Sequence, residues 1–289
     1  MYVIVPRMIT QSLIDFASLN DDLDAKAEQY AAADPFPHIV IDGVLREDVF
    51  AAAAAEFPAI RDPFWKGYLH VNETKYANTQ PDTWGQTLTA VAREFVSADF
   101  VAYLERLTGI AGLIADWSMD GGGLHQTLRG GHLNIHADFS THHTHDNWAR
   151  RVNILLYLNE EWREDWGGRL ELWDKDMTAV RGGVTPKGNR MLVFTTSQDS
   201  FHGHPDPLTC PEDVARRSMA LYYFTEESEA VRRSTDYRAR PDDGIKKVAI
   251  WADKNAVDLY DRAKRRLGIS DDTVQRWLAR VDRLRRRGD

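Results

Sequence analysis

The hydrophobic and polar positions change their period along the chain, which separates a helical first part from a β-rich middle part. Residues 59–83 are rich in turn residues and aromatics, and the pattern predicts no regular element for them. A short β-type run stands at His38–Ile41 and is closed by a turn. Apolar residues at helical spacing predict helices at 10–33, 46–57, 84–97 and 98–109.

The segment from about 112 to 225 carries short β-type runs between turn signals. Examples are the run at 151–159, RVNILLYLN, and the run at 190–196, RMLVFTT, with glycine pairs at 167–168 and 182–183 between runs. No helix-length apolar segment separates them. Short strands at this spacing predict a β-sandwich or barrel instead of a parallel α/β sheet.

The chain becomes polar after residue 226 and then helical again. Ser270 has the position of a helix N-cap, with acidic residues in the following turn. An apolar stripe then predicts a helix that packs on the β body, although a partner contact or a cap over an active site is an alternative. We therefore divide the chain into a domain at 1–240, with its core at about 112–225, and a helical extension at 241–289. The stripe consists of Val274, Trp277, Leu278, Val281 and Leu284.

Composition and charge narrow the class of protein. The 289 residues include 43% hydrophobic and 10% aromatic residues, which is enough for a large buried core. The net charge of −8 argues against nucleic acid as a partner, although 261–289 holds 10 Lys/Arg against 5 Asp/Glu. The single Cys210 fits a reducing compartment, and no signal peptide or long apolar span is present. We expect a cytoplasmic protein without a membrane segment, and an oligomer through the C-terminal helices is possible.

The segment Asn134-Ile-His136-Ala-Asp138 carries the first chemical signal. In a strand, residues i and i+2 point to the same face, so His136 and Asp138 project together. An imidazole and a carboxylate form half of a facial metal site. A second imidazole would complete a set that suits non-haem iron(II) and leaves coordination positions open. This pair alone is a weak signal, because such spacings arise by chance.

A second signal lies about 65 residues downstream. Ser200-Phe-His202-Gly-His204 follows an apolar strand and offers a distal histidine, with His202 and His204 as alternatives. The last β run begins at Arg216-Arg217-Ser218, and Arg216 and Ser218 share a strand face. A guanidinium and a hydroxyl can hold a carboxylate.

Taken in this order, the motifs resemble the 2-oxoglutarate/Fe(II) oxygenase superfamily, in particular its prolyl-4-hydroxylase-like branch. The resemblance covers about 112–225 and implies a double-stranded β-helix, or jelly roll, in a mainly β α+β fold with flanking N- and C-terminal helices. It implies His136, Asp138 and His202 as iron ligands, because family members have a hydrophobic residue two positions after the distal histidine. The spacing from His202 to Arg216 is longer than usual and predicts an inserted loop at 206–214.

The resemblance also implies the cofactors and the reaction. Fe(II), 2-oxoglutarate and O2 are expected, with ascorbate as a candidate addition. Arg216 and Ser218 would bind 2-oxoglutarate, with Arg217 as the alternative anchor. Related halogenases have a small residue in place of the carboxylate, so Asp138 implies hydroxylation of an aliphatic C–H, with release of succinate and CO2. The substrate would be an amino-acid-like small molecule or a prolyl or other residue in a protein.

Other polar residues near these motifs are weaker candidates. Asn134 shares the expected face of His136 and could reach 2-oxoglutarate, and Gln126 could reach it or the substrate. Asn153 stands in an apolar strand and requires a buried partner or a pocket. His142 follows the metal strand and could contact substrate or be an exposed loop residue. His125 and His132 are interpreted as structural.

Two other classes of function compete with the oxygenase. A catalytically silent jelly-roll binding protein would not need all of His136, Asp138, His202 and Arg216. A zinc hydrolase is disfavoured because no HExxH motif occurs.

Overall fold

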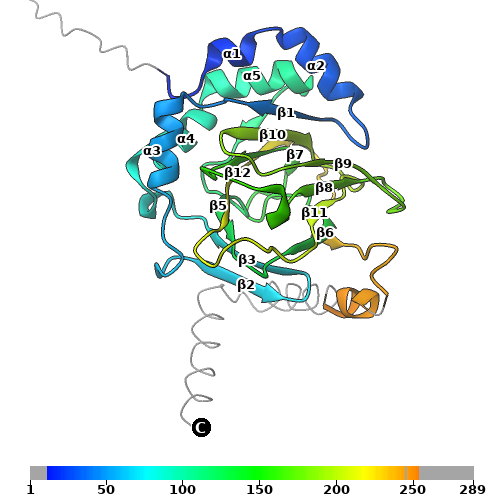
Figure 1. The fold of residues 1–289 in the computed structure, drawn as a ribbon. Coiled ribbons are helices and arrows are strands. Elements are labelled where there is room, and N and C mark those ends of the chain that lie inside the picture. The colour runs from blue at the N-terminus through cyan, green and yellow to red at the C-terminus, as the bar shows by residue number, and fades with distance from the viewer. Residues whose placement is uncertain (1–11, 245, 254–289) are drawn as a thin grey trace, which may run out of the picture.

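The computed structural model describes residues 12–244 and 246–253, and it shows a curled antiparallel sheet with helices packed over one side (Figure 1). The helices are α1 (Phe16–Asn20), α2 (Leu23–Ala32), α3 (Glu47–Ala55), α4 (Gln86–Phe95) and α5 (Ala98–Thr108), with 3-10 turns η1 (Pro81–Thr83) and η2 (Glu164–Trp166). Residues 246–253 are also helical.

The strands form one 13-stranded sheet in the described part of the chain. Along the sheet the order is β1-β10-β7-β12-β5-β3-β6-β11-β8-β9, with β2, β4 and β13 attached to β3, β12 and β6. The strands are β1 (His38–Asp42), β2 (Lys66–His70), β3 (Glu73–Asn78), β4 (Ile114–Ala115), β5 (Gly123–Thr127), β6 (Leu133–Ala137), β7 (Trp148–Tyr157), β8 (Leu170–Trp173), β9 (Val180–Val184), β10 (Arg190–Thr195), β11 (His202–His204), β12 (Arg216–Glu226) and β13 (Asp236–Tyr237).

This arrangement is a jelly roll, as expected. The pairings among the described strands are antiparallel, and the sheet curls until β3 meets β6, which nearly closes a barrel. The expected strands in 112–225 are confirmed. The helical predictions are confirmed too, except that the first helix divides into α1 and α2 at Asp21-Asp22.

The helix α5 shows how the local sequence fixes an element. Ser97 accepts a hydrogen bond from the amide of Phe100 and caps the start. Gly109 ends the helix in the left-handed conformation, with φ of 70°, which a glycine adopts without a steric penalty. Phe100, Leu104 and Leu107 lie on one side and are buried.

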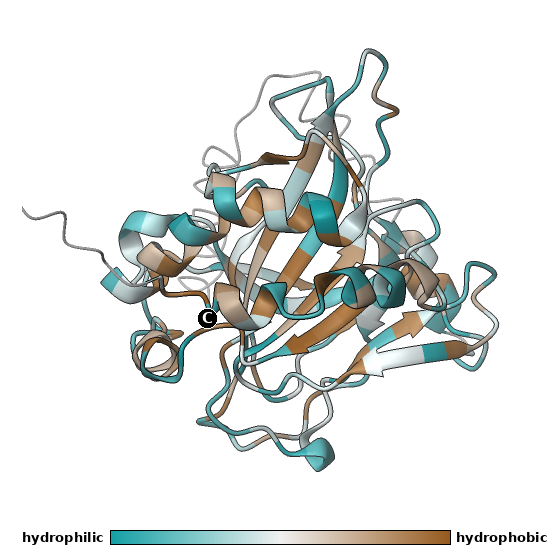
Figure 2. Ribbon diagram, turned by 90° about the horizontal axis from the view of Figure 1, so that it is seen from above, coloured by the Kyte–Doolittle hydropathy of each residue, from teal (hydrophilic) through white to brown (hydrophobic). Residues whose placement is uncertain are grey.

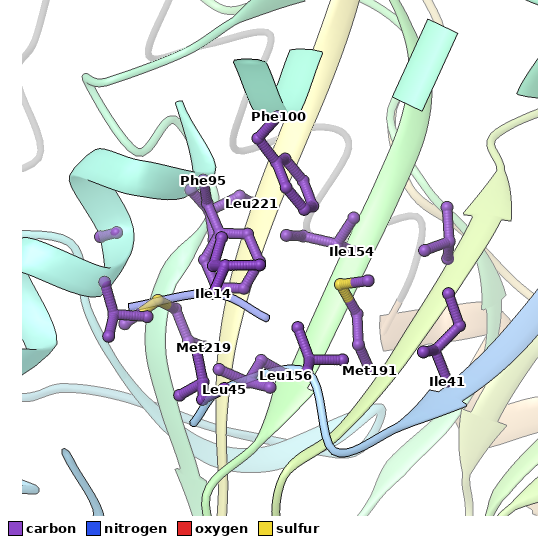
Figure 3. Packing of buried hydrophobic residues seen from close by; sticks show 14 of the residues in the cluster. Ile14, Ile41, Leu45, Phe95, Phe100, Ile154, Leu156, Met191, Met219 and Leu221 are labelled. Atoms are coloured by element: carbon purple, nitrogen blue, oxygen red, sulfur yellow. The ribbon is translucent and has the colours of Figure 1, made fainter. Parts of the chain in front are cut away.

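The main hydrophobic core lies between these helices and the outer face of β7, β10 and β12. Figure 3 shows Phe95 and Phe100 from the helices packed near Ile154 and Leu221 from the sheet. The Phe95 and Phe100 ring centroids are 4.7 Å apart in an edge-to-face contact. Seen from above, the helices cross over apolar strands and present hydrophilic positions outward (Figure 2).

A second apolar cluster fills the inside of the curled sheet. Its members come from strands on both sides of the barrel and lie on the face opposite to the helices. Along each strand, residues of this inner face therefore alternate with residues of the outer face, which pack against the helices. The cluster consists of Phe36, Tyr157, Leu170, Leu172, Val184, Leu192 and Phe194.

The region predicted to be irregular, 59–83, contains a hairpin. Strands β2 and β3 pair from Lys66↔Ala77 to His70↔Glu73, and β3 continues onto β5 and β6. The prediction missed it because the inner face of β3 carries Glu73 and Lys75, a buried ion pair with a 3.0 Å separation, in place of apolar residues. The period-2 signal is therefore weak there.

The end of the described chain crosses the barrel next to this hairpin. Strand β13 pairs with β6, which places the Tyr237 ring 5.5 Å from the His136 ring. The helical residues 246–253 lie against the hairpin, where His70 contacts Asp253 at 2.8 Å and Glu73 at 3.1 Å. The proposed boundary at residue 240 stays a prediction, and Ser270 with the apolar stripe falls outside the described residues.

The loop predicted at 206–214 is present between β11 and β12. Cys210 within it is buried and free. In the part of the chain described here, no helix has the length and hydrophobicity needed to cross a membrane.

A matched pair of leucine substitutions tests the position of the core. Leu104 is fully buried, whereas 64% of the Leu69 surface is exposed. Leu104→Ala should lower the free energy of unfolding by about 2–5 kcal/mol, through lost burial and a cavity. Leu69→Ala should change it by no more than about 0.5 kcal/mol. Urea denaturation measures both, and equal losses would contradict the assigned core.

The contact of His70 with two carboxylates predicts a pH dependence. Hydrogen bonding to Glu73, with a further contribution from Asp253, raises the pKa of His70 above its ordinary value despite partial burial. A raised pKa means that the charged ring stabilises the fold at low pH, and this stabilisation is lost as the pH rises through the raised value. The melting temperature of wild type should exceed that of His70→Gln most at about pH 6, and the difference should shrink towards pH 9. A difference that grows with pH would contradict the assignment.

Candidate metal centre

Three predicted ligands meet at one end of the barrel. His136 on β6 pairs directly with His202 on β11, and Asp138 follows just after β6 ends. Nε2 of His136 lies 3.6 Å from Oδ1 of Asp138, and Nε2 of His202 lies 3.6 Å from Oδ2. The candidate ligand atoms all lie within 4.8 Å of one another. The structure thus brings His136, Asp138 and His202 together, and this group does not include His204.

Both imidazoles are held by backbone hydrogen bonds. Nδ1 of His136 donates to the carbonyl of Asn134 at 2.9 Å, and Nδ1 of His202 donates to the carbonyl of Ser200 at 2.9 Å. Since a carbonyl can only accept, Nδ1 carries the proton and Nε2 presents its lone pair to the cluster. Burial, together with the nearby His136, lowers the pKa of His202 to about 4, so its ring is neutral at pH 7.

The carboxylate of Asp138 is braced from β7. Asn153 donates its amide to Oδ2 at 2.7 Å, and Nη2 of Arg150 lies 3.2 Å from the same oxygen. Arg150 also donates from Nε to Asn153 at 2.7 Å. Burial acts to raise the pKa of Asp138, but the charge of Arg150 outweighs it and holds the pKa well below its ordinary value. The group is therefore an ionised carboxylate.

Arg150 is itself fixed by aromatic rings. Its guanidinium carbon lies 3.3 Å from the ring centre of Tyr222 and 4.5 Å from that of Phe139. Only 3% of its surface is exposed. Arg150 and Asn153 therefore form a rigid support for Asp138, which answers why a polar Asn153 stands in an apolar strand.

The donor set fits a non-haem iron(II) ion. Two imidazoles and one carboxylate are the ligands of the facial arrangement that iron(II) oxygenases use. They are buried and preoriented by their own hydrogen bonds, and the two imidazole Nε2 atoms and the carboxylate converge on one point.

A buried arginine stands on the inner face of the same barrel. Arg216 is 6% exposed, donates from Nε to the carbonyl of Gly168 at 2.8 Å and from Nη2 to the Tyr157 hydroxyl at 3.2 Å. Burial lowers its pKa from the ordinary value. Among residues 12–244 and 246–253, no carboxylate forms an ion pair with it. A buried cation of this kind requires an anionic partner to offset its desolvation.

The register of β12 decides between Arg216 and Arg217. Ser218 pairs with Tyr157 and with His125, so Arg216 and Ser218 share the inner face with these residues. Arg217 pairs with Gln126 and faces the helices, where its guanidinium lies 5.2 Å from the Phe57 ring. The structure therefore places Arg216 and Ser218 inside the barrel and leaves Arg217 and Gln126 outside.

Two further candidates lie away from the cluster. A register shift between β6 and β11 interrupts the alternation before His136, and the Asn134 amide donates to Val71 and Asn72 in the β2–β3 turn. The expectation that Asn134 shares the face of His136 is therefore not met. His142 is 2% exposed, its Nε2 lies 3.4 Å from Oδ2 of Asp116, and it is not part of the ligand cluster, so it is not an exposed loop residue.

The sequence reasoning missed two inner-face residues, Tyr157 and Arg150, and gave two others, His125 and His204, different roles. Tyr157 and Arg150 could have been found, since both lie on β7 beside the singled-out Asn153. His125 was interpreted as structural, yet it faces inward, and burial with the charge of Lys75 lowers its pKa to about 3. His204 is buried, and burial followed by the charge of Arg216 holds its pKa well below the ordinary value.

The comparisons with known proteins agree with this site. Residues 122–224, which contain every motif described above, match the model of the 2OG-Fe(II) oxygenase superfamily. This segment of the chain is therefore similar to that superfamily, and the relative described next fits its prolyl-hydroxylase-like branch.

Particular relatives are prolyl hydroxylases. Prolyl 3-hydroxylase OGFOD1 of Mus musculus is 30% identical over 80 residues, which cover 26% of this chain and 14% of that protein. The match therefore spans about one seventh of the relative. A Trichoplax adhaerens prolyl hydroxylase, solved with a peptide fragment, has a TM-score of 0.54 at 15% identity, covering 74% of this chain and 94% of that one. A Pseudomonas putida prolyl-4-hydroxylase has a TM-score of 0.45 at 18% identity, covering 71% and 98%.

The brace on Asp138 predicts an effect on metal affinity. Asn153→Leu removes the hydrogen bond to Oδ2 and should weaken binding of a divalent metal by about 10–100-fold. The matched control is Asn159→Leu, since Asn159 is also buried but bonds Pro186 and Arg217. Isothermal titration with Co(II) measures both. If the two variants bound the metal as tightly as each other, the bracing role of Asn153 would be wrong.

Proposed function

We propose that the chain is an Fe(II)- and 2-oxoglutarate-dependent dioxygenase that hydroxylates an aliphatic C–H. The observation that supports it most is the joint presence, on one barrel interior, of the His136–Asp138–His202 cluster and the buried cation of Arg216. A metal ligand set alone would suit several reactions. An additional inner-face guanidinium without a carboxylate partner is what a dicarboxylate cosubstrate requires.

The chain's own residues then have distinct roles. His136, Asp138 and His202 would hold iron, with Asn153 and Arg150 keeping Asp138 in one orientation. Arg216 would bind the distal carboxylate of 2-oxoglutarate, and Tyr157, which accepts a hydrogen bond from Arg216, keeps its own proton free to donate to the same group. When bound, iron with 2-oxoglutarate and O2 would supply the oxidation that turns C–H into C–OH and 2-oxoglutarate into succinate and CO2.

The apolar inner cluster contributes by excluding water. Leu172 on β8 pairs with His202, and the ring of Phe194 on β10 lies 4.7 Å from the ring of His202. Both are almost fully buried. A dry environment strengthens the electrostatic contacts of Arg216 and protects the reaction from side reactions with water.

The substrate that we propose is a prolyl or other residue in a protein, or an amino-acid-like small molecule. Of these substrates we favour a prolyl residue, because of the similarity to prolyl 3-hydroxylase OGFOD1. We also place the reaction in the reducing cytoplasm, which the free Cys210 supports. The silent binding alternative has no observation in its favour, because His136, Asp138 and His202 form one cluster and Arg216 lies on the same inner face.

Formation of succinate from 2-oxoglutarate is the direct test of this function. Wild type loaded with Fe(II) and then exposed to O2 should form succinate, slowly without substrate and faster with a prolyl peptide. Asp138→Ala and His202→Ala should each reduce this to the background without iron. Protein that binds iron and 2-oxoglutarate but forms no succinate with any peptide or amino acid would favour the silent alternative.

The role of Arg216 can be tested separately through the cosubstrate. Arg216→Ala should raise the KM for 2-oxoglutarate on the order of 100-fold, since a charge-assisted pair to a buried carboxylate is lost. Arg217→Ala, its neighbour on the outer face, is the matched control and should leave this KM within about threefold. If Arg217→Ala had the larger effect, the assignment of the two faces of β12 would be wrong.

A further inference from the structure

His204 is a buried polar residue without an explained role. It is 2% exposed, it is not part of the metal cluster, and its Nδ1 has no hydrogen-bond partner among the described residues. Buried polar atoms are nearly always paired, so an unpaired ring nitrogen indicates a partner that the protein itself does not supply.

The strand register directs His204 towards the inside of the barrel. His202 pairs with Leu172 and Gly203 with Glu171, so the antiparallel ladder leads from His204 to Leu170. Leu170 and Leu172 both belong to the inner apolar cluster. His204 therefore shares the inner face with His202, displaced along β11 away from the metal ligands.

This displacement brings His204 towards the arginine end of the pocket. Gly203 pairs with Glu171, and the same ladder continued towards Gly168 runs beside the residues that follow His204. Nε of Arg216 donates a hydrogen bond to the carbonyl of Gly168, two residues before β8 begins, and β8 is the strand that pairs with β11. His204 and Arg216 thus lie on neighbouring parts of the barrel wall, next to the place where an anionic partner of Arg216 would bind.

Gly203 fixes the strand at this point. A Cβ on Gly203 would lie 2.7 Å from the carbonyl oxygens of Leu133 and Asn134, so β11 approaches β6 more closely than any other residue would permit. The backbone on the N-terminal side of His204 is therefore tightly held. The ring has little freedom to leave the barrel and find another partner.

We propose that His204 is a cosubstrate-binding residue, whose Nδ1–H donates a hydrogen bond to the 2-oxoglutarate carboxylate that Arg216 holds. This rests on the proposed function. The carboxylate then receives the charge of Arg216 and hydrogen bonds from Tyr157 and His204. A carboxylate can accept several hydrogen bonds. Nδ1 of His204, which has no partner among the described residues, would be paired when 2-oxoglutarate is bound.

Direct binding to the zinc-loaded full chain tests this without turnover. Zinc accepts the same ligand types and has no redox reaction. Calorimetric titration of 2-oxoglutarate should give a Kd about 10-fold higher for His204→Leu than for wild type, which is the loss of one hydrogen bond to a charged group. His204→Asn retains an N–H near the Nδ1 position and should recover most of the affinity.

The controls separate this bond from general damage. Gln126→Leu also removes a buried side chain with an unpaired nitrogen, but on the outer face, and should leave the Kd unchanged. Zinc affinity and melting temperature should be the same in all variants compared. In wild type labelled with 15N-histidine, the Nδ1 resonance of His204 should shift on addition of 2-oxoglutarate, and this needs no variant.

The outcomes distinguish this inference from the proposed function. If wild type binds 2-oxoglutarate, but His204→Leu binds equally well or the Nδ1 resonance does not shift, His204 has no such role and the proposed function stands. If His204→Asn loses as much affinity as His204→Leu, ring shape and not the hydrogen bond is responsible, which also overturns the inference. If zinc-loaded wild type does not bind 2-oxoglutarate, both fail.

Discussion

The two-residue period of β7 and β12 is the constraint on which the rest of this structure depends. One face of each strand must bury apolar side chains against the helices, as Leu156 and Met219 do. The other face is thereby obliged to point into the barrel, where Asn153, Tyr157, Arg216 and Ser218 stand. A shift by a single residue would exchange the two sets, so the packing of the helices and the composition of the pocket are fixed by one and the same register.

The inner face carries several buried polar groups, and specific partners hold most of the charged ones. Asp138 is satisfied by Asn153 and Arg150, Arg150 by two aromatic rings, and Glu73 by Lys75. Such groups are costly to bury unless paired. Among the described residues, Nδ1 of His204 has no hydrogen-bond partner and Arg216 has no carboxylate partner, which is why we assign this region to an anionic ligand.

The fold class could be predicted from the sequence because strand alternation is a strong local signal. The ligand cluster was predicted from the order of three motifs and the family resemblance, because the His-x-Asp pair alone is a weak signal. Strand alternation is clear in β7, β10 and β12, and the His-x-Asp spacing places both side chains on one face. The β2–β3 hairpin was not predicted, since its inner positions are Glu73 and Lys75 and its apolar period is weak. Asn134 was misplaced because a register shift between strands has no signature in the spacing of one strand. Arg216 could be separated from Arg217 only by the family pattern, and the pairing of β12 with β5 gives the physical reason.

The hydrogen bonds from His136 and His202 to backbone carbonyls have a consequence for the stability of the metal-free protein. Many small metal-binding domains are unfolded until the ion arrives, because nothing else orders their ligands. Here the rings are oriented by carbonyl groups of their own strands, and Asp138 is oriented by β7, with the helices and the inner cluster supplying the stability. An ion lost through oxidation or chelation would thus leave an empty but intact cavity. Such a molecule can be refilled and reused, without passing through an unfolded state exposed to proteases.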